Sequence, residues 1–302
     1  MLVVAALGGN AMLRRGQAMT PDAQRQNVEG AVRALARIVR AGHQLVVTHG
    51  NGPQIGLLAI QTDAWPLDLL GAQTDGMIGY VIEQALENEL QHDRPIVTLM
   101  TQVVVDASDP AFRAPTKFVG PVWSKAEAEA IAGPRGWSIA QDGEKWRRVV
   151  ASPVPIAIPD TKVIKALLDQ GAVVICGGGG GIPVIRHPDG ALHGVEAVVD
   201  KDRASALLAL EIKADALLLL TDVKAIFRDF GQAHASAIDR IAATEAALLT
   251  LPEGSMRPKV EAAVGFVRGG GGLAAIGRLE DAMEVLQGRT GTRIYADDPP
   301  NP

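Results

Sequence analysis

Three glycine-rich turns, each placed directly after a short apolar run, constrain the fold more than any other feature of the sequence. They are Gly8-Gly9-Asn10, Gly50-Asn51-Gly52 and Gly177–Gly181. Apolar runs of this length, such as Leu2–Leu7, are typical of strands buried on both faces of a parallel sheet. Segments with helical spacing, such as Ala23–Arg40, separate the runs. Strands that alternate with helices predict an α/β protein with a mainly parallel sheet covered on both faces.

The other elements predicted from the sequence follow the same alternation. Strands are predicted at Gln44–Thr48, Ile96–Val105, Ala172–Cys176, Ala216–Leu220 and Leu273–Ile276. Helices are predicted at Thr74–Leu90, Asp160–Gln170, Asp202–Glu211, Arg257–Arg268 and Glu280–Leu286.

The middle of the chain interrupts this order with proline, glycine and most of the tryptophans. Within it, Trp137–Val150 is typical of a hairpin with Gln141-Asp142-Gly143 at its turn. We interpret residues 111–155 as an inserted subdomain that projects from a main body built by the rest of residues 1–302.

Charge, hydropathy and cysteine content limit the partners. The formal net charge is −5 and no long run of Lys or Arg occurs, which argues against nucleic acid as the main partner. The apolar runs are far shorter than the roughly 20 residues of a membrane span, and the first lacks the basic start of a secretory signal. Cys176 is the only cysteine, so it forms no disulfide within the chain and no metal cluster. We therefore expect a cytoplasmic protein with small-molecule ligands and no membrane contact.

The glycine turns predict anion binding. Ligands of open parallel sheets collect at the carboxyl ends of the strands, where these turns lie. Glycine lets backbone N–H groups approach an anion closely, and a following helix N-terminus adds positive potential. Each turn alone is explained better as a tight strand–helix connection, but three in one chain favour an anion site. None has the spacing of a P-loop or of a dinucleotide-binding turn, and no protein-kinase motif is present.

Three lysines are candidates for stabilising a transferred phosphoryl group, because that reaction depends mainly on positioning and positive charge. Lys201 lies between Asp200 and Asp202 at a predicted helix start, where the helix dipole disfavours a cation. The alternative interpretation of Lys201 is a solvated lysine paired with these aspartates. Lys259 lies near another helix start, and Lys117 lies in the inserted region, where a mobile cation could close over a site. By itself, Lys117 would be interpreted as a surface lysine.

His49 precedes the second glycine turn and invites interpretation as a general base. A carboxylate-like acceptor is already anionic and needs no deprotonation. We therefore interpret His49 as a turn residue or a residue behind the site.

Taken together, eight segments resemble carbamate kinases of the amino acid kinase superfamily, in that family's order and along almost the whole chain. They are Ala6–Ala11, His49–Gln54, Thr101–Asp106, Pro115–Lys117, Gly178–Val184, Gly194–Asp202, Thr221–Val223 and Gly254–Ala262. The Gly-Gly-Asn start is shared with other superfamily members, whereas Thr-Gln-Val-Val-Val-Asp followed by Pro-Thr-Lys is more specific to carbamate kinases.

The resemblance implies a three-layer α/β/α sandwich with a protruding lid subdomain, usually as a homodimer. The N-terminal half would bind the acceptor and the C-terminal half would bind ATP or ADP with Mg2+. The implied reaction is phosphoryl transfer between ATP and carbamate, giving ADP and carbamoyl phosphate. We expect it to run toward ATP synthesis in arginine catabolism.

The resemblance also implies roles for individual residues. The residues that would cradle carbamate and the phosphoryl group are Gly8, Gly9, Asn10, Gly50, Asn51 and Gly52. Lys201 and Lys259 would stabilise the transferring group, Asp202 would hold these lysines, and Lys117 would reach in from the lid. The nucleotide would contact Gly178, Gly179, Lys201, Thr221, Asp222, Met256, Pro258 and Lys259.

Three places depart from the family pattern, and other functions stay open. Ala275-Ile276-Gly277-Arg278 replaces a more usual stretch that ends in Thr-Ser. The lid reads Gly143-Glu144-Lys145-Trp146-Arg147 where the family usually has Gly-Arg-Gly-Trp-Arg, and Phe227 replaces a common tyrosine. The alternatives are a superfamily kinase acting on another carboxylate or on a phosphate monoester, a catalytically silent nucleotide-binding regulator, and a purely structural α/β protein.

Overall fold

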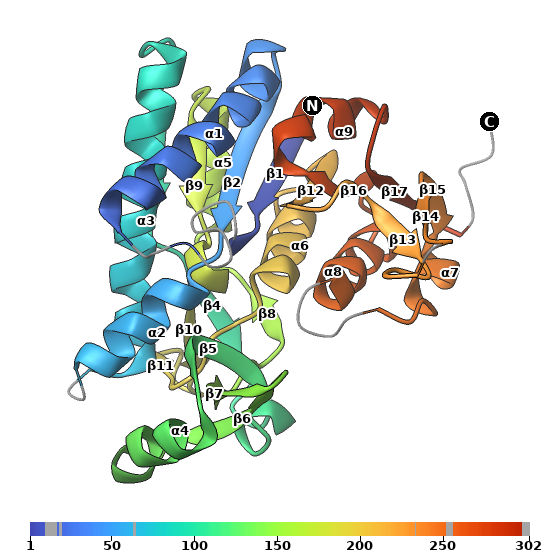
Figure 1. Cartoon of the computed structure of the whole chain (residues 1–302). Coiled ribbons are helices and arrows are strands. Elements are labelled where there is room, and N and C mark those ends of the chain that lie inside the picture. The colour runs from blue at the N-terminus through green and yellow to red at the C-terminus, as the bar shows by residue number, and fades with distance from the viewer. Residues whose placement is uncertain (10–16, 18–19, 63–64, 233, 252–255, 298–302) are drawn as a thin grey trace.

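The central layer of the protein is an eight-stranded sheet with the order β15-β17-β16-β12-β1-β2-β9-β3 (Figure 1). The computed structural model describes residues 1–9, 17, 20–62, 65–232, 234–251 and 256–297. The strands of this sheet are β1 (Leu2–Leu7), β2 (Gln44–His49), β3 (Ile96–Leu99), β9 (Val173–Cys176), β12 (Ala216–Thr221), β15 (Arg240–Ala242), β16 (Leu273–Arg278) and β17 (Thr292–Tyr295). All neighbours pair in parallel except β16 and β17.

Alternate residues of the strands face two separate apolar cores. In β1, Val4 and Ala6 belong to one core, whereas Val3, Ala5 and Leu7 belong to the other. All five are fully buried, because side chains of successive strand residues point to opposite faces and both faces are covered. The continuous apolar run of this strand is therefore explained by burial on both sides.

Helices cover each face of the sheet and complete three layers. The first face carries α1 (Pro21–Arg40), α3 (Leu67–Leu90) and α9 (Ala282–Gln287). The second face carries α5 (Thr161–Asp169), α6 (Lys201–Glu211), α7 (Ala243–Ala247) and α8 (Met256–Arg268). Among the described residues, no helix is both long enough and apolar enough to cross a membrane. The α/β fold with a mainly parallel sheet is confirmed.

Smaller sheets lie beside the main sheet. A four-stranded sheet has the order β11-β10-β4-β8, and β13 pairs with β14. These strands are β4 (Gln102–Val105), β8 (Pro155–Ala157), β10 (Ile182–Arg186), β11 (Leu192–Gly194), β13 (Ile226–Arg228) and β14 (Ser236–Ile238).

Residues 117–150 build a separate unit, here called the protruding unit, which lies at the lower end of the molecule in Figure 1. Its three antiparallel strands have the order β5-β7-β6, and α4 packs beside them. The elements are β5 (Lys117–Trp123), α4 (Lys125–Ala132), β6 (Ser138–Asp142) and β7 (Lys145–Val150). Ser124 and Glu127 form a capping box that fixes the start of α4. The hairpin predicted over Trp137–Val150 is confirmed by the pairing of β6 with β7.

Three details of the predicted elements were wrong. Ile96–Val105 is not one strand but two, because the chain leaves the main sheet after β3 and enters the four-stranded sheet as β4. At the break, the Thr101 hydroxyl donates to the Leu99 carbonyl and the Gln102 N–H donates to Asp160. A continuous apolar run cannot reveal such a break. In addition, α3 begins at Leu67 rather than Thr74, and the short helix α2 (Gly52–Gln61) was not predicted.

Candidate active site

The three glycine turns lie side by side at one edge of the main sheet. They follow β1, β2 and β9, which are neighbours in the sheet and run in parallel, so their carboxyl ends meet. A Cβ atom added at Gly50 would lie 3.7 Å from Cα of Gly9 and 3.4 Å from Cδ of Lys201. The first two turns and Lys201 are therefore in direct proximity. Asn10 lies outside the described residues.

Helix α6 begins at this edge, and its first turn supplies charged groups to it. Asp200 is the N-cap residue and its side chain accepts hydrogen bonds from the N–H groups of Asp202 and Arg203. This places Lys201 and Asp202 in the first turn of the helix, as predicted. The hydroxyl of Ser205, one turn later, pairs with Thr48 of β2 at 2.6 Å and fixes the helix against the sheet.

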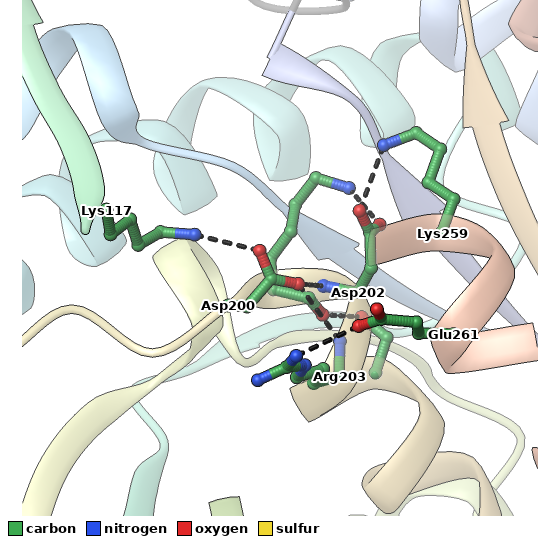
Figure 2. Close-up of polar contacts among 8 residues, drawn as sticks. Lys117, Asp200, Asp202, Arg203, Lys259 and Glu261 are labelled. Atoms are coloured by element: carbon green, nitrogen blue, oxygen red, sulfur yellow. Dashed lines mark hydrogen bonds and ion pairs between the residues drawn. The ribbon is translucent and has the colours of Figure 1, made fainter. Parts of the chain in front are cut away.

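Asp202 joins two lysines that come from different helices (Figure 2). Its Oδ1 accepts from Nζ of Lys201 at 2.5 Å, and its Oδ2 accepts from Nζ of Lys259 in α8 at 2.9 Å. The three side chains are nearly buried, with 12%, 5% and 10% exposure for Lys201, Asp202 and Lys259. Beside them, Arg203 and Glu261 form a second contact between α6 and α8 at 2.9 Å. The structure thus brings together three of the residues that the resemblance assigned to catalysis.

Burial and neighbouring charges change the pKa values of Lys201 and Asp202. Burial lowers the pKa of Lys201, and the neighbouring Lys259 ammonium lowers it further, although Asp202 opposes both effects. Burial alone would raise the pKa of Asp202, but the two ammonium groups hold it below its ordinary value. Two ammonium groups share the one carboxylate of Asp202, which leaves a charge of +1 that attracts an anion to this edge.

Lys117 approaches the same edge from the protruding unit. Its Nζ donates to Oδ2 of Asp200 at 2.8 Å, so it contacts the N-terminus of α6 rather than Asp202 (Figure 2). Three ammonium groups and two carboxylates, those of Asp200 and Asp202, leave a net charge of +1 for the group.

The turn after β2 is supported from behind by buried polar side chains. Nδ2 of Asn51 donates to the Thr74 hydroxyl at 2.8 Å, and Nε2 of His49 lies 3.5 Å from Oδ1 of Asp75. His49 and Asp75 are fully buried, so the imidazole points away from solvent and from any ligand at the strand ends. This agrees with the interpretation of His49 as a residue behind the site. Gly52 begins α2, so the N-terminus of this helix, which was not predicted from the sequence, lies at the turn.

The third glycine turn differs from the prediction because no α-helix follows it. Gly177, Gly179, Gly180 and Gly181 all have positive φ angles, which only glycine adopts easily, and the chain continues into β10. A Cβ added at Gly178 would lie 2.5 Å from Cε1 of His49. It would also collide with the Asp75 carboxylate, just as one at Gly179 would collide with Asn51. This turn therefore packs against the turn after β2 and restricts its position.

The remaining residues assigned to the nucleotide lie at the carboxyl end of β12 and at the start of α8. Thr221 ends β12, and its Cα lies 3.6 Å from the position of a Cβ on Gly8. Its hydroxyl donates to Asp222 at 3.1 Å. Met256 and Pro258 are half-buried in the first turn of α8. Gly254 and Ser255, which belong to the same resembling segment, lie outside the described residues.

Sequence reasoning missed two charged residues of the site. Asp200 was considered as a helix-start residue and as a partner of Lys201, yet it contacts Lys117. Asp75 belongs to no recognised motif and lies within α3. Only the three-dimensional fold therefore shows that it approaches His49.

Comparison with known proteins gives consistent matches over the whole chain. A model of the amino acid kinase family matches residues 1–277. The carbamate kinase of Rhizobium meliloti (strain 1021) is 52% identical over 302 residues, covering 97% of this chain and 93% of that protein. The carbamate kinase of Escherichia coli (strain K12) is 47% identical over 298 residues, with coverages of 97% and 98%. The solved structure of a carbamate kinase from Giardia lamblia bound to AMP-PNP is similar, with a TM-score of 0.89, 39% identity and 98% coverage of both chains.

Proposed function

Because this chain belongs to the carbamate kinases of the amino acid kinase family, we propose that its glycine turns and lysines form the centre where a phosphoryl group moves between ATP and carbamate. The observation that carries this assignment is the Asp202 carboxylate shared by Lys201 and Lys259, directly beside the turn at Gly50. In the reaction, a carbamate oxygen forms a bond to the γ-phosphorus as the bond from that phosphorus to ADP breaks. No proton has to move, since carbamate is already anionic.

The charges at the centre suit this transfer. The transition state spreads negative charge over the phosphoryl oxygens, and fixed positive groups stabilise it without reorganising. We propose that Lys201 and Lys259 donate to these oxygens, and that Asp202 fixes the two ammonium groups in position. The turns at Gly8-Gly9-Asn10 and Gly50-Asn51-Gly52 would present N–H groups to carbamate and to the transferring group.

The two halves of the chain would bind different substrates. We propose that the N-terminal half binds carbamate and that the C-terminal half binds ATP or ADP, through the residues assigned above. The Giardia lamblia relative was solved with AMP-PNP, which supports a nucleotide site in the shared fold. Gly178 and Gly179 would act through the turn after β2, because both pack against it.

Residues 111–155 would act as a lid subdomain. The support is that Lys117, at the start of β5, reaches α6 from the protruding unit. Movement of this unit would bring Lys117 to the phosphoryl group or withdraw it.

We propose Mg2+ as the ion that accompanies the nucleotide. No group of three or more His, Cys, Asp or Glu side chains that could hold a metal occurs among the described residues. Mg2+ typically binds phosphate oxygens and water with only one or two carboxylates, so this donor set fits an ion carried by the nucleotide. Asp222 would contact the ion or its water ligands, and the bound ion would neutralise phosphate charge.

The physiological direction is proposed to be ATP synthesis, as in arginine catabolism. Carbamoyl phosphate is a mixed anhydride, whose phosphoryl group is readily transferred to ADP. Purified protein should therefore form ATP rapidly from ADP, Mg2+ and carbamoyl phosphate, and EDTA should abolish the reaction. N-acetylated amino acids and phosphate monoesters, tested with ATP as acceptors, should not react. A well-folded protein that binds ADP but forms no ATP would instead indicate another acceptor or a regulator.

A homodimer is proposed as the assembly. Strand β3 is an outer strand of the main sheet and packs against α3, which exposes Leu69, Met77 and Tyr80. Met100, directly after β3, is 58% exposed. An unpaired strand edge with apolar neighbours is typical of an interface. Sedimentation equilibrium at micromolar concentration should give twice the 31.7 kDa chain mass, and the mass of one chain would contradict this assembly.

We also propose a cytoplasmic location. Burial raises the pKa of the lone Cys176 thiol, and the Asp75 carboxylate raises it further, so the thiol stays protonated. A chain without disulfides is suited to a reducing compartment. Fractionation of the native host's cells tests this, and recovery of the protein outside the cytoplasmic fraction would reject it.

A further inference from the structure

Asp200 uses its two carboxylate oxygens for two different purposes. Oδ1 accepts hydrogen bonds from the N–H groups of Asp202 and Arg203 and so caps α6. Oδ2 accepts from Nζ of Lys117 at 2.8 Å. Asp200 thus links Lys117 of the protruding unit to the N-terminus of the helix that carries Lys201 and Asp202 (Figure 2).

The contact leaves Lys117 available to a ligand. An ammonium group has three N–H donors, and the carboxylate of Asp200 uses one of them. The Lys117 side chain keeps 26% of its surface exposed, against 17% for Asp200. Asp200 therefore fixes the direction of the ammonium group while two donors can still reach a phosphoryl oxygen.

Asp200 also adds a negative charge beside a site for anions. Removing that charge would raise the net charge of the five groups from +1 to +2 and would strengthen the attraction of a phosphate. If Asp200 were only a counter-charge, a neutral variant would attract phosphate more strongly and would keep its turnover. If Asp200 positions Lys117, a neutral variant would lose turnover.

We propose that Asp200 is a positioning residue that holds Lys117 of the protruding unit against the N-terminus of α6 and aims its ammonium group at the transferring phosphoryl group. This inference rests on the proposed participation of Lys117 in the reaction. Asp200 does not contact the reacting atoms and acts through Lys117.

The test compares Asp200→Asn, Lys117→Met and the double variant with wild type, using ADP, Mg2+ and carbamoyl phosphate. Asparagine caps helices as well as aspartate, so Asp200→Asn keeps the start of α6 and removes the carboxylate charge that holds Lys117. Asp200→Ser, which also caps but cannot reach Lys117, replaces it if the first variant folds poorly. Asp142→Asn is the matched control, because it removes the ion pair of Asp142 with Arg147 inside the protruding unit, away from α6.

We expect Asp200→Asn to lower kcat about tenfold without lowering KM for carbamoyl phosphate, whereas Asp142→Asn leaves both near wild type. The double variant should turn over within about twofold of Lys117→Met alone, because both changes remove one interaction. In the ligand-free enzyme, Asp200→Asn and Lys117→Met should both speed hydrogen exchange of the β5 amides, and Asp142→Asn should not.

Two results would overturn the inference while leaving the proposed function in place. One is a loss of turnover in Lys117→Met together with wild-type kcat in Asp200→Asn, with or without a lower KM. The other is a double variant in which the two losses multiply. Wild-type kcat in Lys117→Met would remove Lys117 from the proposed mechanism and the Asp200 inference with it.

Discussion

The Lys201→Ala variant is expected to form ATP from ADP and carbamoyl phosphate at least about a hundredfold more slowly than wild type. Loss of one fixed donor to a developing oxyanion typically lowers turnover by about 10²–10³. Lys201 is nearly buried and lies directly beside Gly50, so bulk water cannot replace its ammonium group in the same position. The measurement is kcat by a coupled ATP assay at saturating substrates.

Folding should survive this change, which allows the loss to be assigned to chemistry. Asp202 keeps its contact with Lys259 in the variant, and one buried positive charge is removed. Lys259→Ala should also lower kcat, by at least about tenfold, or roughly 1.4 kcal/mol of barrier. Lys162→Ala, on the exposed side of α5, is the matched control and should turn over like wild type. Normal turnover in a folded Lys201→Ala variant would remove Lys201 from the mechanism.

The Asp202→Ala variant should lose both activity and stability. It leaves two buried ammonium groups facing each other without the carboxylate between them, a change that typically destabilises by about 3–5 kcal/mol. Urea unfolding at pH 7 measures this loss as a lower midpoint. Because the two ammonium groups hold the pKa of Asp202 below its ordinary value, its contribution is present above the unfolded pKa, about 3.9. It is lost as the pH falls through the lower folded value.

A triple variant separates the two effects of Asp202. Replacing Lys201 and Lys259 with methionine and Asp202 with leucine removes all three charges and keeps similar volumes, so most of the stability should return. Activity should stay lost, since no cation remains from α6 or α8. If Asp202→Ala unfolds at the wild-type midpoint, the carboxylate is not required to hold the two lysines together.

The sequence predicts those features that depend on residues close to one another in the chain. Continuous apolar runs predicted the buried strands, and the charge order around Lys201 predicted a helix start with a misplaced cation, as found. Lys259 was also a candidate from its position near a helix start, and the resemblance implied that Asp202 holds both lysines. The structure brings Asp202 and Lys259 within hydrogen-bond distance of one another. Their separation in the chain gives no local signal of this contact.

Other features depend on how distant segments meet. Lys117 was expected to reach the site, but its partner Asp200 follows from where the protruding unit lies against α6. The pair of His49 and Asp75 depends on the packing of α3 under the glycine turns. The break within Ile96–Val105 is set by hydrogen bonds of Thr101 and Asp160, which leave the apolar pattern unchanged.

The position of β1 in the main sheet has a consequence for synthesis on the ribosome. β1 pairs with β2 on one side, but its other neighbour, β12, is residues 216–221 and is synthesised much later. For most of translation, one edge of an apolar strand therefore remains open and able to pair wrongly. The same late pairing brings Thr221 beside Gly8, so the proposed catalytic centre is completed only when the last third of this sequence has been made. We expect chaperones to protect the nascent N-terminal half mainly while this edge of β1 is unpaired. The appearance of enzyme activity would show that β12 has paired with it.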